Sequence, residues 1–117
     1  MTTVPERILF KVAFLLTPEF SLVNVASAID TLRVANTLLE RAHYAWILAS
    51  DTTRDVASSS GLALRTDVML ADLKEFDLLL VCGSFKPHKY VRPDTQRLLR
   101  RFARHGRMLG KIGRAHV

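Results

Sequence analysis

Two nearly unbroken apolar runs of strand length constrain this sequence more than any other feature. The first is ILFKVAFLL at residues 8–16, and the second is FDLLLVCG at residues 76–83. A strand with one face in water alternates apolar and polar residues, whereas a strand covered on both faces is apolar at nearly every position. Both runs therefore predict buried parallel strands, which need crossover connections and helices on both faces of the sheet.

Two helices are predicted from their apolar spacing and their end residues. The first begins at Ser21, a suitable N-cap, and runs for about twenty residues. The second covers residues 94–105, with Pro93 near its start and Gly106 after its end, where these residue types suit a helix. In the first helix, apolar residues recur at intervals of three and four: Leu22, Val25, Ala26, Ile29, Leu32, Ala35 and Leu39.

Shorter elements complete the order. YAWILAS at residues 44–50 predicts a strand, and RMLGKI at residues 107–112 predicts another. Residues 56–66 predict a hairpin that turns through Gly61, and LADL predicts a single helical turn. The order strand, helix, strand, hairpin, strand, helix, strand is that of a doubly wound α/β domain.

Positive charge is concentrated in the last quarter of the chain. Residues 1–85 carry seven Lys or Arg against ten Asp or Glu, a net charge of −3, whereas residues 86–117 carry ten against one, a net charge of +9. Two interpretations are open: contact with nucleic acid, or a solvated helix face. The spacing favours a solvated face, because apolar and basic residues take opposite sides of the second helix: Leu98, Leu99 and Phe102 against Arg97, Arg100, Arg101 and Arg104.

The single cysteine and the short apolar runs indicate a compartment. Cys82 has no intrachain disulfide partner, which fits a reducing environment. The apolar run at residues 8–16 is too short to span a bilayer and lacks a cleavage site. We expect a cytoplasmic protein without membrane contact.

Four stretches resemble, in order and spacing, the N-terminal half of the class I glutamine amidotransferase-like (PfpI-like) domain of AraC-family transcriptional regulators: VAFLLTPEFSLVNVASAIDTLRVAN, SSSGLAL, DLLLVCGS and LLRRFARHGRMLG. The resemblance covers residues 7–110. It implies a flavodoxin-like, doubly wound, mainly parallel sheet, here as an incomplete three-layer sandwich. It also implies a domain that senses a small molecule, such as an amine or an amino-acid derivative, in a homodimer. DNA would be bound by a separate, missing C-terminal helix-turn-helix domain.

The last seven residues, KIGRAHV at 111–117, stand where the family has a sharp strand-to-helix turn. In family enzymes that turn holds the nucleophilic cysteine. The heptapeptide is the translation of AAGATCGGAAGAGCACACGTC, which apart from its first base begins a widely used sequencing adapter. We therefore expect residues 1–110 to be a partial sensing domain and residues 111–117 to be a non-native tail. The alternative is a genuine short protein with a basic tail.

The resemblance implies no complete catalytic set. Family enzymes pair their cysteine with a carboxylate after the first strand, and Ser21 occupies that position here. Glu19 is interpreted as a solvated turn residue, and Cys82, at the end of another strand, as a buried and inert thiol. We expect no catalytic residue and no enzyme activity. The alternative is a PfpI-like cysteine-dependent peptidase, amidase or hydratase.

Ligands of open α/β sheets bind beyond the carboxyl ends of the strands. That rule predicts two ligand-binding segments facing one crevice: Pro18, Glu19, Phe20 and Ser21, and Cys82, Gly83, Ser84 and Phe85. The histidines lack the spacing of metal ligands, and GSFKP lacks the glycines of a phosphate loop. We therefore expect no metal and no cofactor.

Overall fold

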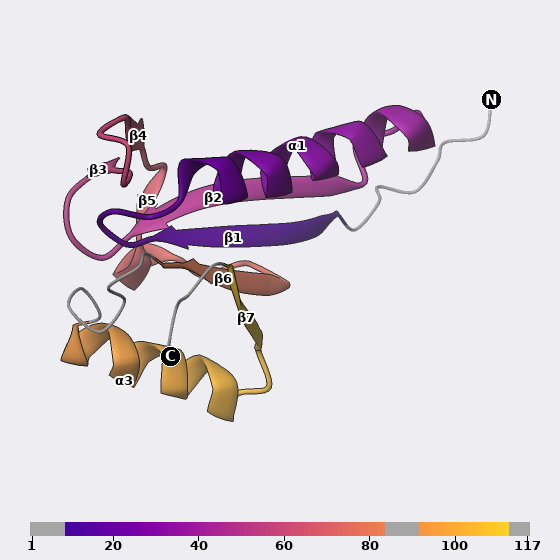
Figure 1. The fold of residues 1–117 in the computed structure, drawn as a ribbon. Helices are drawn as coiled ribbons and strands as arrows, with labels where there is room; N and C mark the ends of the chain where they lie inside the picture. The colour runs from indigo at the N-terminus through magenta and orange to yellow at the C-terminus, as the bar shows by residue number, and fades with distance from the viewer. Residues whose placement is uncertain (1–8, 84–91, 113–117) are drawn as a thin grey trace.

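A computed structural model describes residues 9–83 and 92–112 (Figure 1). Its centre is a five-stranded sheet in the order β5-β2-β1-β6-β7, and every pairing in it is parallel. The strands are β1 Phe10–Leu16, β2 Tyr44–Ser50, β5 Val68–Met69, β6 Leu78–Cys82 and β7 Met108–Ile112. This parallel sheet, with a helix on each face, confirms the predicted flavodoxin-like, doubly wound α/β fold.

Helix α1 (Leu22–Leu39) lies on one face of the sheet, and helix α3 (Pro93–Arg104) lies on the other (Figure 1). An antiparallel hairpin of β3 (Asp55–Ala57) and β4 (Ala63–Arg65) lies near the N-terminal end of α1. A 3-10 turn, η1 (Leu70–Asp72), follows β5. The predicted hairpin and helical turn are therefore confirmed.

Strand β1 is buried on both faces from Val12 onward, which explains its nearly unbroken apolar sequence. Val12, Phe14 and Leu16 belong to the core cluster under α1, because alternate side chains of a strand point to the same face. Ala13 and Leu15 belong to the cluster under α3. Each fully buried large side chain contributes about 1.5–3 kcal/mol, so this strand supplies a large share of the stability of both layers.

Helix α1 differs in detail from its predicted apolar face. Leu22, Val25, Ile29 and Leu32 pack against the sheet, whereas Ala26 and Leu39 are exposed. The last turn instead directs Asn36 towards β2. Its side-chain amide donates to the Tyr44 carbonyl (2.9 Å) and its oxygen accepts from the Tyr44 N–H (2.8 Å). The polar Asn36 thereby fixes the connection from α1 to β2.

Strand β5 was not predicted, because the predicted hairpin ends at residue 66 and the predicted helical turn begins at Leu70. Val68 and Met69 pair with Ala49 and Ser50 of β2. Two residues are too few to show a strand period, so only the tertiary pairing reveals this edge strand.

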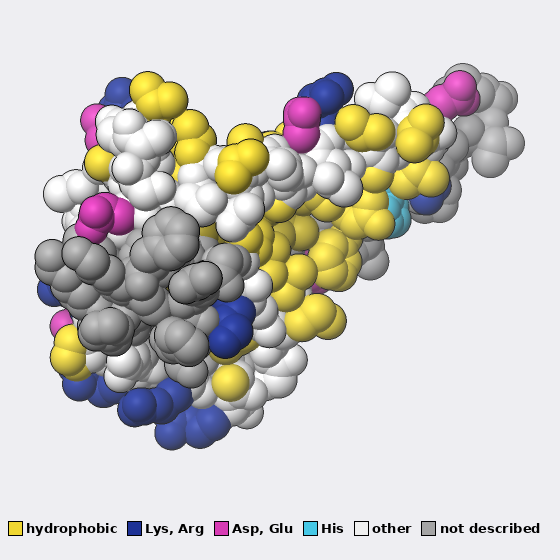
Figure 2. Space-filling model, viewed as in Figure 1, with side chains coloured by type: hydrophobic (Ala, Val, Ile, Leu, Met, Phe, Trp, Pro, Cys, Tyr) yellow, Lys and Arg dark blue, Asp and Glu magenta, His cyan; other side chains and the backbone are white. Residues whose placement is uncertain are grey.

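Helix α3 has the predicted division into apolar and basic sides. Leu99 is buried, and Leu98 and Phe102 pack partly against the core. The four predicted arginines, Arg97, Arg100, Arg101 and Arg104, are exposed, and Figure 2 shows basic side chains along this part of the surface. Pro93 is the first helical residue, and Gly106 adopts a φ of 75° after the helix end, as a C-terminal glycine does.

The structure describes only the first two residues of the predicted tail. Lys111 and Ile112 belong to β7, where they pair with Val81 and Cys82 of β6. Residues 113–117 lie outside the described residues. The assignment of residues 111–117 to a non-native tail stays a prediction. Within the described part of the chain, neither helix is long and apolar enough to cross a membrane.

Candidate functional site

The carboxyl ends of β1, β6 and β7 meet at one edge of the sheet. Thr17, directly after β1, donates two hydrogen bonds to the Cys82 carbonyl at the end of β6, one from its N–H (3.2 Å) and one from its Oγ1 (2.7 Å). The Gly83 N–H donates to the Ile112 carbonyl of β7 (3.2 Å). The segments that follow β1 and β6 therefore start side by side, and their forming one ligand-binding crevice stays a prediction.

The chain leaves β1 through a tight turn. Pro18 takes its second position, and Glu19 takes its third position with a φ of 64°. The Phe20 N–H closes the turn on the Thr17 carbonyl at 3.1 Å, which is the pattern of a type II turn. The Glu19 N–H donates to the Ala57 carbonyl of β3 (2.8 Å), so the hairpin holds this conformation in place.

Two of the predicted ligand-binding residues lie in the core. The side chain of Phe20 is 0% exposed and that of Cys82 is 1% exposed, and both belong to the cluster under α1. Both side chains lie beneath the carboxyl edge of the sheet as a buried floor, and neither reaches the protein surface. Glu19 is exposed, Pro18 and Ser21 are partly buried, Gly83 is buried, and Ser84 and Phe85 lie outside the described residues.

The Cys82 thiol is held in its neutral form. Burial raises the pKa of Cys82 to about 12, because the apolar surroundings disfavour a thiolate. Its Sγ lies 3.6 Å from the Leu80 carbonyl, the acceptor of a weak hydrogen bond. A thiol needs its thiolate form to act as a nucleophile, so Cys82 has the properties of a structural cysteine.

Ser21 occupies the position where the family resemblance implies a catalytic carboxylate. It is the N-cap of α1 by backbone conformation, but its hydroxyl makes no capping hydrogen bond, which corrects part of the N-cap prediction. The first-turn N–H groups of α1 are thus left without a side-chain cap, so a bound polar group could take that place. The hydroxyl cannot act as the missing acid.

The hairpin closes one side of this edge, a feature that sequence analysis missed. Phe20 forms an isolated bridge with Ser58, and the Ser59 N–H donates to the Phe20 carbonyl (2.9 Å). The Ser58 and Ser60 hydroxyls lie 2.9 Å apart. The only signal in the sequence was SSSG, which marked the turn without showing that it folds back onto the loop after β1.

A second polar group lies beyond β2, also at the carboxyl edge. The Asp51 carboxylate accepts a hydrogen bond from the Thr95 hydroxyl at the start of α3, and the Asp51 carbonyl accepts one from Arg92 (2.9 Å). The other carboxylate oxygen is buried and has no hydrogen-bond partner among the described residues. A cavity of about 180 Å³ adjoins this group.

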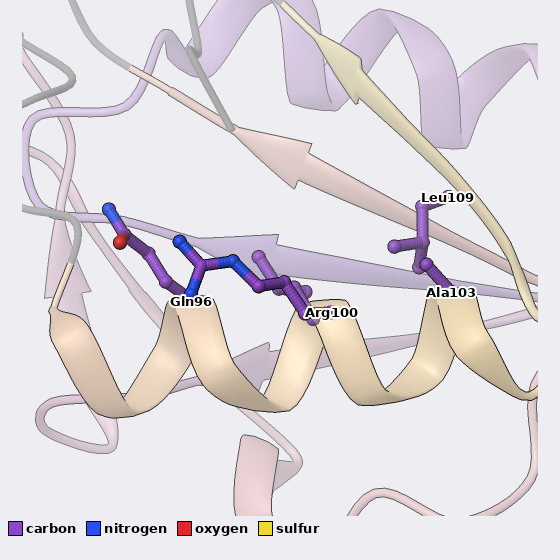
Figure 3. Close-up of a pocket in the computed structure, with 5 residues that line it drawn as sticks. Gln96, Arg100, Ala103 and Leu109 are labelled. Carbon is purple, nitrogen blue, oxygen red and sulfur yellow. The ribbon is translucent and has the colours of Figure 1, made fainter.

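Another cavity, of about 290 Å³, lies between α3 and the edge strand β7 (Figure 3). Its lining is Gln96, Leu99, Arg100, Ala103 and Leu109. Arg100 is its one ionisable group, so it offers no acid-base pair. Over the described ranges, no three His, Cys, Asp or Glu side chains come close enough to hold a metal ion.

Comparison with known proteins identifies the family of this chain. The family model described as DJ-1/PfpI family matches residues 10–117. The HTH-type transcriptional regulator CdhR of Pseudomonas aeruginosa is 38% identical over 107 residues, which are 89% of this chain and 31% of that protein. The chain therefore spans about a third of the length of that regulator.

Solved structures have a similar fold. An AraC family transcriptional regulator from Pseudomonas putida has 38% sequence identity and a TM-score of 0.77, covering 87% of this chain and 63% of that one. A DJ-1 superfamily protein from Agrobacterium tumefaciens has 21% identity and a TM-score of 0.67, covering 88% of this chain and 53% of that one. The second likeness concerns the fold alone.

Proposed function

The chain belongs to the DJ-1/PfpI family, and from this premise we propose that it is part of the ligand-sensing, dimerising domain of an AraC-family transcriptional regulator. The similarity to regulators at 38% identity supports the assignment. In this proposal DNA is bound by a different part of the regulator, and the protein works in the cytoplasm, where its lone cysteine stays reduced.

The observation that carries the proposal is the pair of hydrogen bonds from Thr17 to the Cys82 carbonyl. These bonds hold two strand ends together, so the groups that follow them can contact one small molecule. The Glu19 carboxylate suits the ammonium group of an amine. The uncapped first turn of α1 beside Ser21 suits the carboxylate of an amino-acid derivative. The proposed site keeps Pro18, Gly83, Ser84 and Phe85 as neighbours and Phe20 and Cys82 as its floor.

We infer further that this chain is not an enzyme. The described thiol is buried and protonated at neutral pH, and Ser21 stands where a carboxylate would be needed. A cysteine-dependent peptidase, amidase or hydratase would need an accessible thiolate. No observation on the described residues favours that alternative.

The test is thermal unfolding of the chain with ethanolamine, glycine and related small amines and amino acids. A ligand at 100 times its dissociation constant stabilises the folded state by about 2.7 kcal/mol, which is a shift of several degrees. We expect at least one compound to raise the melting temperature. The shift should be reduced in Ser21→Ala and kept in Ser27→Ala, a matched change on the exposed face of the same helix. No shift with any compound, or equal shifts in both variants, would contradict the proposed site.

A further inference from the structure

Lys11 is the one charged residue of β1, the middle strand of the sheet, and it lies on the side that faces α3. Ala13 and Leu15, the next residues on that side, are fully buried in the cluster under α3, whereas Lys11 is only partly buried. Its pairing partner in β2 is Ala45, a small residue. A charge on the inner side of a central strand needs water or a polar partner. Lys11 therefore marks a polar space at this end of the sheet.

A cavity of about 580 Å³ lies at that end of the sheet. It is lined from the starts of β1 and β2, from the residues before β6 and from the residue before β7. Because these strands are parallel, their amino ends meet at one edge, opposite to the edge of the proposed sensing site. The volume is within the range of small-molecule pockets, about 300–1,000 Å³. We call this space the amino-edge cavity, and its lining includes Leu9, Lys11, Lys74, Phe76, Asp77 and Arg107.

Arg107 is held in place by its neighbours. Its Nη2 donates to the Lys74 carbonyl (2.9 Å) and to the Phe76 carbonyl (3.2 Å). The guanidinium also lies over the Phe76 ring, with Cζ 4.0 Å from the ring centroid. A guanidinium has five N–H donors, and those on Nε and Nη1 make no hydrogen bond to a described residue. Arg107 therefore brings fixed and unused donors to the amino-edge cavity.

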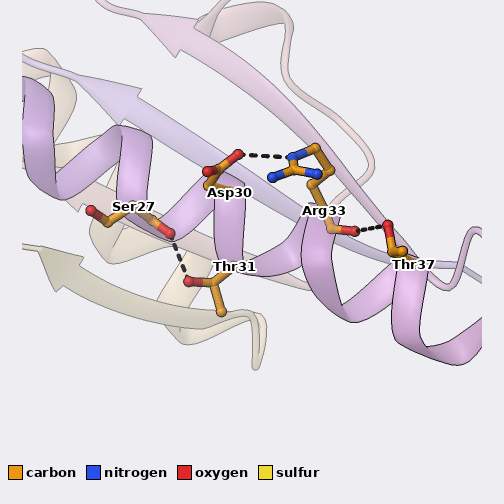
Figure 4. A network of polar contacts seen from close by, with 5 residues as sticks. All are labelled: Ser27, Asp30, Thr31, Arg33 and Thr37. Atoms are coloured by element: carbon orange, nitrogen blue, oxygen red, sulfur yellow. Dashed lines mark hydrogen bonds and ion pairs between the residues drawn. The ribbon is translucent and has the colours of Figure 1, made fainter.

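The three cations of the cavity, Lys11, Lys74 and Arg107, are not paired with carboxylates. On α1, by contrast, Arg33 and Asp30 pair directly at 2.8 Å (Figure 4). Over the described part of the chain, no carboxylate comes within ion-pair distance of the side-chain nitrogens of the three cations. Positive charges that share a concave space without a partner repel one another and attract an anion. The cavity is therefore suited to a negatively charged molecule.

Two carboxylates, those of Glu75 and Asp77, also line the cavity, but they do not cancel its three cations. The Asp77 carboxylate accepts a hydrogen bond from the Lys11 N–H (2.7 Å), and the Asp77 N–H donates to the Lys11 carbonyl (2.8 Å). These two bonds join the start of β1 to the segment before β6, so the Asp77 carboxylate has a structural role. Glu75 is exposed, so its side chain can turn towards water. The cavity thus keeps an excess of positive charge.

We propose that the amino-edge cavity binds a small organic carboxylate. The carboxylate accepts hydrogen bonds from the unused donors of Arg107, and Lys11 adds a second positive charge; such charge-assisted hydrogen bonds are stronger than neutral ones. The apolar body of the ligand contacts Leu9 and Phe76 on the cavity wall. An inorganic anion would leave these apolar side chains and most of the volume unused. This site lies at the other end of the sheet from the proposed sensing site and does not depend on it.

The first experiment titrates the chain with benzoate and with succinate, neither of which has an amine, and follows the backbone amide signals by NMR. Wild type is compared with Arg107→Gln and with Arg101→Gln, a matched loss of one charge on the exposed side of α3. We expect saturable shifts at residues 9–11, 74–77 and 107 with at least one of the two compounds. The dissociation constant should rise about tenfold or more in Arg107→Gln and change less than about twofold in Arg101→Gln. No saturable shift, or equal weakening in both variants, would overturn the proposal.

The second experiment keeps the test valid if Arg107→Gln fails to fold. Lys11→Gln removes a cation that makes no side-chain hydrogen bond to a described residue, so the fold should persist while carboxylate binding weakens several-fold. Inorganic phosphate is titrated in parallel, and binding as tight as that of the organic carboxylates would show general anion attraction and refute the proposal. Ser21→Ala should leave carboxylate binding unchanged. Loss of binding in Ser21→Ala would place the carboxylate at the sensing site, whereas an amine response without carboxylate binding would refute this site alone.

Discussion

Two glutamates adopt left-handed backbone conformations, Glu19 with a φ of 64° after β1 and Glu40 with a φ of 55° at the C-cap of α1. A residue with a side chain pays about 1–2 kcal/mol for this conformation. At Glu40 the conformation only ends a helix. At Glu19 the left-handed conformation turns the chain across the carboxyl edge of the sheet, where the proposed ligand site lies. The backbone strain at Glu19 therefore helps to position the residues of that proposed site.

We predict that Glu19→Gly and Glu40→Gly each raise the free energy of unfolding by about 0.5–1 kcal/mol, because glycine removes the steric cost and gives back part of it as unfolded-state entropy. Urea unfolding measures both. Only Glu19→Gly should also weaken the melting shift produced by an amine, since it alone removes the proposed carboxylate. Destabilisation by Glu19→Gly would show that its side chain supports the fold instead.

The buried Cys82 thiol should make stability fall at high pH. Its pKa is raised from an ordinary value of 9.0 to about 12, so the folded state binds this proton more tightly than the unfolded state. The resulting stabilisation is fully present below pH 9 and is lost as the pH rises from 9 to 12, by at most about 1.4 kcal/mol per pH unit. Urea unfolding of wild type and Cys82→Ala at pH 8 and pH 10.5 measures this effect. The stability advantage of wild type should shrink at the higher pH, and a constant difference would refute the assignment.

The residues of the candidate site show where sequence reasoning reached its limit. The rule on strand ends identified the edge at which β1 and β6 end, because it depends only on where the apolar runs stop, and ligand binding at that edge stays a prediction. It could not separate Phe20 and Cys82, whose side chains turn into the core, from Glu19, which stays at the surface. That distinction depends on the turn at Pro18 and on the hairpin that covers it, which are tertiary features.

Among the helices and strands, the sequence predicted best those that are long and have a regular apolar spacing. The apolar runs fixed β1 and β6, and the divided pattern of residues 94–105 fixed both sides of α3. Strand β5 has two residues and carries no period of its own. The apolar spacing of α1 predicted its buried side incompletely, because Ala26 and Leu39 are apolar but exposed.

The basic side of α3 gives a prediction about nucleic acid. Its arginines are exposed, and Arg97 pairs with Asp94 on the same helix. A lone basic helix face attracts phosphate without reading bases. We expect weak binding to any DNA duplex that is lost between 50 and 200 mM salt, with Arg100→Gln and Arg101→Gln together reducing the salt dependence. Gel-shift titrations with unrelated duplexes measure this. Retention of one sequence over the others at physiological salt would contradict it.

At the scale of the whole molecule, the two faces of the sheet are covered unequally. Helix α1 lies along β1 and β2, and the core side chains beneath it extend beyond it to Leu78 and Leu80 of β6 and Ile112 of β7 (Figure 1). These three side chains are only partly buried, and Figure 2 shows apolar side chains reaching the surface below α1. An apolar area left open in this way is normally an interaction surface.

We predict that residues 1–117 fold into this α/β arrangement but are marginally stable and associate beyond a dimer at high concentration. Full burial of two large side chains is worth about 3–6 kcal/mol, and leaving them partly exposed forgoes a part of it, which matters against the whole stability of a small domain at about 5–15 kcal/mol. Leu80→Thr and Leu79→Thr form a matched pair, because the two neighbours point to opposite faces of β6. Leu80→Thr should reduce the large species seen by size exclusion at a cost of about 1 kcal/mol, whereas Leu79→Thr, fully buried, should cost about 2–4 kcal/mol. A monodisperse species that melts cooperatively, binds no hydrophobic dye and is equally destabilised by both threonine variants would show that the face beside α1 is closed.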